Sequence, residues 1–182
     1  MSVLESPLAE VERAVQERAK LVALDMGGPD GPTRLRTLVD EEVARWTEDY
    51  KRGRREFDLA DPETVAERAW RNLAGYGPLE PLLADPDVWE VMVNAPDQIF
   101  VRRHRGISGY HDEVFHDDDH VLRTLTKILD DATGSHRKLD PAEGLQDAQL
   151  DTGARLHIVH GDVGRGGHII VNIRKFTGVL FA

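Results

Sequence analysis

Two arginines in the last third of the sequence are spaced so that they could bind a phosphate group. Arg155 and Arg174 belong to the segments Arg155–His160 and Ile169–Arg174, in which apolar and polar side chains alternate as in half-buried β-strands. If the two strands pair, their apolar side chains must share one face, because a slip of one residue would expose one set to water. The two arginines then lie opposite or diagonal to each other on the polar face.

Two guanidinium groups in this arrangement repel each other by about a few tenths of a kcal/mol unless an opposite charge relieves them. A phosphate group would do so, because the planar guanidinium fork matches two phosphate oxygens. The same alternation also fits two solvated arginines on an exposed sheet face. The spacing by itself leaves both interpretations open.

The elements that precede these strands divide the chain in two. Residues 1–74 carry three amphipathic patterns and predict a helical bundle, in which Ser6 and Asp61, each followed by proline, begin the first and third helices. Alternating glycine and proline predict a linker at about residues 27–32, between the first two helices.

The second half, residues 75–182, combines short strands with one strong helix. The helix is expected to begin near Asp118 and to end near Ala132, and the predicted strands are Trp89–Asn94, Gln98–Arg103, Leu145–Leu150, Arg155–His160 and Ile169–Arg174. The fold class predicted for the whole chain is therefore α+β: a helical bundle followed by a largely antiparallel sheet with one main packed helix.

Composition limits the partners of this protein. The 182 residues include 23 Lys and Arg against 33 Asp and Glu, a net charge of −10, so the overall field repels nucleic acid and we expect no nucleic-acid partner. There is no cysteine and no apolar run long enough for a membrane span, which leads us to expect a cytoplasmic protein.

His116 and His120 flank three aspartates, but acidic capping of the helix explains these residues better than a metal site, and no metal is expected.

Two longer stretches resemble a known family. Gly75 to Arg103 (GYGPLEPLLADPDVWEVMVNAPDQIFVRR) and Leu145 to Phe176 (LQDAQLDTGARLHIVHGDVGRGGHIIVNIRKF) resemble the opening and the close of the second N-terminal module of the CpaF-like (Tad/Flp pilus) type II/IV secretion ATPases, within the secretion protein E family. A Gly-Pro-Leu-x-Pro-Leu-Leu box, an Asp-x-Gly-x-Arg turn and an Ile-Arg-Lys-Phe ending occur in the family's order.

This resemblance implies a PAS-like N-terminal domain of a hexameric motor for pilus assembly or secretion. It implies that Arg155 and Arg174 reach the phosphates of ATP, bound with Mg²⁺, and that the partners are a motor domain, neighbouring subunits of a homo-hexamer and an inner-membrane platform protein. Recruitment to the cytoplasmic face of the inner membrane would follow. Lys175 alternates away from Arg174, and a solvated or rim position is expected for it.

The sequence departs from the family in one respect. It contains no Gly-x-x-x-x-Gly-Lys-Ser/Thr P-loop and no acidic Walker B segment, and the nearest stretch, Gly161–His168, has glycine in place of the lysine and lies between two strands. We therefore expect the RecA-like motor domain to be absent from this chain and the chain alone not to hydrolyse ATP. The alternative is a stand-alone PAS-like interaction or sensor module.

Overall fold

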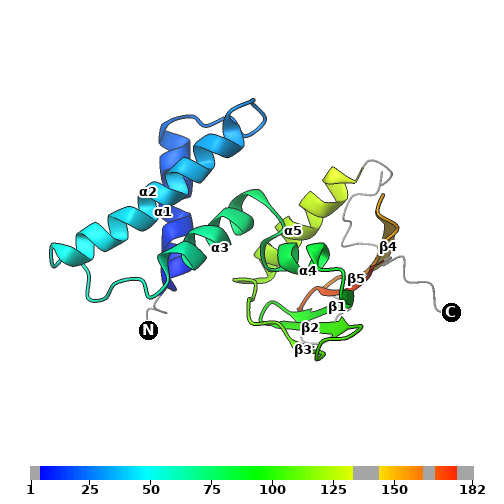
Figure 1. Cartoon of the computed structure of the whole chain (residues 1–182). Coiled ribbons are helices and arrows are strands. Elements are labelled where there is room, and N and C mark those ends of the chain that lie inside the picture. The colour runs from blue at the N-terminus through cyan, green and yellow to red at the C-terminus, as the bar shows by residue number, and fades with distance from the viewer. Residues whose placement is uncertain (1–4, 133–143, 162–166, 176–182) are drawn as a thin grey trace. The chain divides into compact units, whose positions relative to one another are not determined.

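The computed structural model describes residues 5–132, 144–161 and 167–175. The chain forms two compact units, Met1–Gly77 and Pro78–Ala182. Within the described residues it is an α+β protein, with helices first and a six-stranded sheet after them (Figure 1), as the sequence predicts.

The first unit is built from three helices. They are α1 (Pro7–Leu21), α2 (Gly31–Lys51) and α3 (Pro62–Ala74), coloured blue to green in Figure 1. The hydroxyl of Ser6 accepts a hydrogen bond from the backbone N–H of Ala9 at 3.2 Å, and the carboxylate of Asp61 accepts one from Thr64 at 3.0 Å. Both predicted helix starts are thus confirmed. Helix α2 begins inside the stretch predicted as a linker, because Pro32 occupies its first turn, where a missing N–H costs nothing.

The three helices enclose one apolar core. Its centre includes Val15 and Val39, both fully buried, and Trp46, which is 3% exposed. The indole Nε1 of Trp46 donates a hydrogen bond to the carbonyl of Phe57 at 3.0 Å, and the guanidinium of Arg55 lies 3.6 Å from the indole ring centre. Arg55 also pairs with Glu10, so this arginine of the basic run Lys51–Arg55 serves packing within the unit.

The second unit begins with two short helical segments and continues into the sheet. Its elements are η1 (Gly77–Leu79), α4 (Glu80–Ala84), β1 (Val88–Ala95), β2 (Gln98–Arg103), β3 (Gly109–Tyr110), α5 (Asp118–Asp131), β4 (Leu145–Gln149), β5 (Arg155–Val159) and β6 (Ile170–Arg174). The strand order is β3-β2-β1-β6-β5-β4, and every neighbouring pair is antiparallel.

Helix α5 lies on one side of this sheet (Figure 1). It begins where Asp117 accepts a hydrogen bond from the backbone N–H of His120 at 2.8 Å, which confirms acidic capping by Asp117, while Asp118 and Asp119 lie in the first turn. The apolar side chains of the sheet that face the core are buried; they are Val91, Val93, Ile99, Val101, Leu156, Ile158, Val171 and Ile173. The opposite face of the sheet carries most of the polar side chains of the strands.

Among the described residues, no helix has both the length and the apolar character that crossing a membrane requires.

Candidate anion site on the exposed face of the sheet

The two arginines singled out by the sequence lie directly opposite each other. Strands β5 and β6 pair so that Arg155 faces Arg174, Leu156 faces Ile173 and Ile158 faces Val171. The leucine, valine and isoleucines are buried, whereas both arginines are exposed. The apolar sets therefore share one face of the sheet and the arginines the other, as the alternation predicts.

The guanidinium of Arg155 has no ion-pair or hydrogen-bond partner among the described residues. Its cross-strand neighbour carries the same charge, and such a pair is unfavourable unless an anion or solvent screens it. Arg155 could therefore bind a ligand without losing an ion pair or hydrogen bond to any residue that the structure describes.

Arg174 is only partly engaged within the protein. Its Nε lies 3.3 Å from Oε1 of Glu90, while 71% of its side chain remains exposed. No bond from its two terminal nitrogens to a described residue accompanies this contact. The internal ion pair fixes one edge of the guanidinium and leaves the terminal fork open to solvent.

Glu90 and Arg102 belong to the same group of side chains, and sequence reasoning missed both. The register of β1 places Glu90 opposite Arg102 on β2 and opposite Arg174 on β6. Arg102 Nε lies 3.3 Å from Oε2 of Glu90, and Asn172 Nδ2 donates to Oε1 at 2.9 Å. A single charged residue in an otherwise uncharged strand was the available signal, but a bulge at Trp89 breaks the alternation that would have assigned it to a face.

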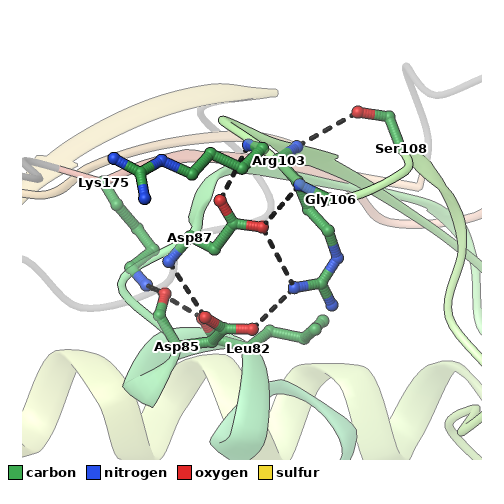
Figure 2. A network of polar contacts seen from close by, with 8 residues as sticks. Leu82, Asp85, Asp87, Arg103, Gly106, Ser108 and Lys175 are labelled. Atoms are coloured by element: carbon green, nitrogen blue, oxygen red, sulfur yellow. Dashed lines mark hydrogen bonds and ion pairs between the residues drawn. The ribbon is translucent and has the colours of Figure 1, made fainter.

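A network of polar contacts links Lys175, which directly follows β6, to the end of α4 and to the turn after β2 (Figure 2). Asp87 accepts hydrogen bonds from the backbone N–H groups of Arg105 at 2.8 Å and Gly106 at 3.0 Å, and these bonds lower the pKa of its carboxyl group. Asp85 accepts a bond from Arg103 Nη1 at 2.6 Å, which lowers the pKa of Asp85 as well. A Cβ on Gly106 would lie 2.9 Å from Asp87 Oδ2, so only glycine fits there without displacing the carboxylate.

Lys175 belongs to this network, and the expectation of a solvated or rim position for it is wrong. Its Nζ donates to the carbonyl oxygens of Leu82 at 2.9 Å and Asp85 at 2.5 Å, at the C-terminal end of α4 (Figure 2). Partial burial lowers the pKa of its ammonium group, and carbonyls at a helix end are the groups that stabilise a cation there. Lys175 thereby anchors the end of β6, directly after Arg174.

The histidine pair at the start of α5 is structural. The backbone N–H of His116 donates to Nδ1 of His120 at 3.1 Å, which leaves the proton of the neutral ring on Nε2, a buried atom with no partner among the described residues. Burial, followed by the nearby His116 and Arg123, lowers the pKa of His120 to about 4. The described residues contain no group of three or more potential ligands that could hold a metal ion.

The lowered pKa of His120 predicts a loss of stability in mild acid. Below pH 6.5 the unfolded chain binds a proton that the folded chain takes up only near pH 4, so the free energy of unfolding falls as the pH drops through this window. Between pH 7 and 4.5 the expected loss is about 2 kcal/mol. Urea unfolding of wild type and His120→Gln at both pH values tests this, because the variant should lack this part of the pH dependence. An equal change in the free energy of unfolding between pH 7 and 4.5 in both proteins would contradict the prediction.

Neither a protein-family model nor a curated protein matches the sequence significantly. Among solved structures, the chain is similar to the VirB11 ATPase from the Brucella suis type IV secretion system, determined in complex with sulphate. The sequence identity is 26%, the match covers 58% of this chain and 31% of that chain, and the TM-score is 0.46. The chain thus spans less than a third of that ATPase, and a TM-score at this level does not establish a shared fold.

Proposed function

We propose that the sheet unit brings Arg155 and Arg174 to the phosphates of a nucleotide held by the motor domain of a type II/IV secretion ATPase of the CpaF-like kind. The observation that carries this proposal is the register of β5 and β6, which sets the two arginines side by side on the exposed face. The motif order that resembles the CpaF-like ATPases supports it independently. In such a complex, the chain is the nucleotide-closing domain, and the helical unit contacts partners.

The residues present suit a phosphate group. Arg155 is unpaired among the described residues, Arg174 presents its terminal nitrogens, and both stand on a face open to solvent. ATP with Mg²⁺ would supply the phosphoryl group that is transferred. Guanidinium groups stabilise the negative charge that develops on this group during the transfer. The P-loop that holds ATP and Mg²⁺ would come from the motor domain, since this sequence contains no such segment.

The wider setting follows from the same proposal. The chain would work in the cytoplasm within a homo-hexamer, next to an inner-membrane platform protein that recruits it to the membrane. The chain's net charge of −10 is consistent with protein partners rather than with nucleic acid.

A reconstitution experiment tests the proposal. The 182-residue chain is mixed with a purified P-loop motor domain of a CpaF-like ATPase, and phosphate release from ATP is followed with each protein alone and with the mixture. We expect the chain alone to be inactive and the mixture to exceed the motor domain by about 10²-fold or more, because a single charge-stabilising donor typically contributes about 10²- to 10³-fold. A stand-alone interaction module would leave the rate of the motor domain unchanged.

A further inference from the structure

Glu90 is a buried carboxylate on the otherwise exposed face of the sheet. Its side chain is 5% exposed, and it is met by the two Nε atoms of Arg102 and Arg174 at 3.3 Å each and by the amide of Asn172 at 2.9 Å. A buried charge persists only where it is paired and hydrogen-bonded, and here both carboxylate oxygens have a cationic partner. Glu90 therefore holds two guanidinium groups at fixed positions on neighbouring strands.

The charged side chains form one row across four strands. In strand order the row is Arg102, Glu90, Arg174 and Arg155, as the registers of β2 with β1, β1 with β6 and β6 with β5 require. Three positive charges and one negative charge leave the row with an excess of two. A row of this sign stands out on a chain that is acidic overall.

Arg102 forms an ion pair with the other carboxylate oxygen of Glu90. It meets Glu90 through Nε, its side chain is 49% exposed, and its guanidinium lies 5.7 Å from the ring centre of Trp89. No bond from its terminal nitrogens to a described residue is present. Because Arg102 and Arg174 pair with Glu90 through Nε, the two terminal nitrogens of each guanidinium remain for a second anion. A guanidinium that is already held in place loses less conformational freedom when it binds this anion.

We propose that Glu90 is a positioning residue for the anion site and that Arg102 is its third phosphate-binding side chain. This inference rests on the proposed function and deepens it. The ligand class is a polyphosphate chain, because a row with three guanidinium groups on separate strands offers more donors than one phosphate group can use.

Orientation and simple charge attraction predict opposite results at position 90. Glu90→Gln adds one unit of positive charge to the row, so attraction alone predicts tighter binding of an anion. If Glu90 orients the two arginines, the variant binds more weakly. The probe is inorganic triphosphate, titrated into the full 182-residue chain at low ionic strength by calorimetry.

We expect Glu90→Gln to weaken binding by about tenfold and Arg102→Ala by about fivefold, in line with the loss of charge-assisted hydrogen bonds. Arg105→Ala is the matched control, because it removes the same charge from an exposed arginine of the same unit with no side-chain partner among the described residues. It should change binding by less than about twofold, because Arg105 is exposed, lies outside the row and its charge is screened by salt. Arg102→Lys keeps the charge next to Glu90 but not the fork, and should bind as weakly as Arg102→Ala.

A second measurement separates positioning from a merely structural role. In NMR spectra, the Nε–H signal of Arg174, which donates to Glu90 at 3.3 Å, should be protected from exchange with water in wild type and lose that protection in Glu90→Gln, with an unchanged urea midpoint. Tighter binding by Glu90→Gln, equal binding by Arg102→Ala and Arg105→Ala, or no binding by wild type would each overturn the inference. Loss of motor stimulation in Arg155→Ala and Arg174→Ala with full stimulation in Arg102→Ala would leave the proposed function standing and this inference refuted.

Discussion

Alanine at position 174 is expected to lower ATP hydrolysis by the mixture of chain and motor domain by about 10²- to 10³-fold, the usual effect of removing one donor that stabilises developing charge. Arg174 is the better of the two arginines for this role because Glu90 already fixes its Nε edge at 3.3 Å, so its fork is oriented before the nucleotide arrives. The loss should fall on kcat more than on KM, because the contact strengthens as the phosphoryl group is transferred.

Three variants make this result interpretable. Arg155→Ala should show a smaller loss, because its guanidinium has no internal partner among the described residues to orient it. Arg174→Lys should remain well below wild type, since an ammonium group cannot reproduce the guanidinium fork. Arg105→Ala should retain full stimulation, and a matching loss there would show that the arginine at 174 acts only through net charge.

Alanine in place of Trp46 is expected to destabilise the helical unit by about 3–5 kcal/mol, the range for truncating a buried large aromatic side chain. Trp46 is 3% exposed at the centre of the three-helix core. The substitution would also leave the carbonyl of Phe57 without its indole donor and remove the ring on which Arg55 stacks. A loss of this size is a large fraction of the stability of a small domain, so partial unfolding at 25 °C is expected.

The measurement is urea unfolding of the full chain followed by far-ultraviolet circular dichroism. Tyr50→Ala is the control on the same helix, because Tyr50 is 43% exposed and its removal should change the free energy of unfolding by less than about 1 kcal/mol. Similar urea midpoints of unfolding for Trp46→Ala and Tyr50→Ala would mean that burial of Trp46 does not stabilise the core of the helical unit.

Local rules were enough to predict where α1, α3 and α5 begin and which way the side chains of β5 and β6 face. Ser6, Asp61 and Asp117 each accept a backbone hydrogen bond from a residue three positions later, a contact that depends only on the neighbouring sequence. The same holds for Arg155 and Arg174, whose face follows from the apolar residues that alternate with them. These features need no knowledge of the rest of the chain.

Lys175 shows where such reasoning ends. Alternation assigns it correctly to the side of the strand opposite Arg174, but nothing nearby in the sequence indicates that its ammonium group reaches the carbonyls of Leu82 and Asp85. The contact spans about ninety positions and depends on where α4 ends. A side chain expected in solvent thus becomes an anchor for the end of β6.

By itself the amino-acid sequence determined the α+β class, the starts of α1, α3 and α5 and the shared face of Arg155 and Arg174, because capping and side-chain alternation act over a few residues. Only the tertiary structure decided that β1 lies between β2 and β6, and hence that Glu90 joins Arg102 to Arg174. Alternation predicts which face of the sheet a side chain points to, but it does not predict which strands pair. At Glu90 even the face cannot be predicted, because the bulge at Trp89 interrupts the alternation. The row of charges exists because the folded sheet brings strands more than eighty residues apart into register.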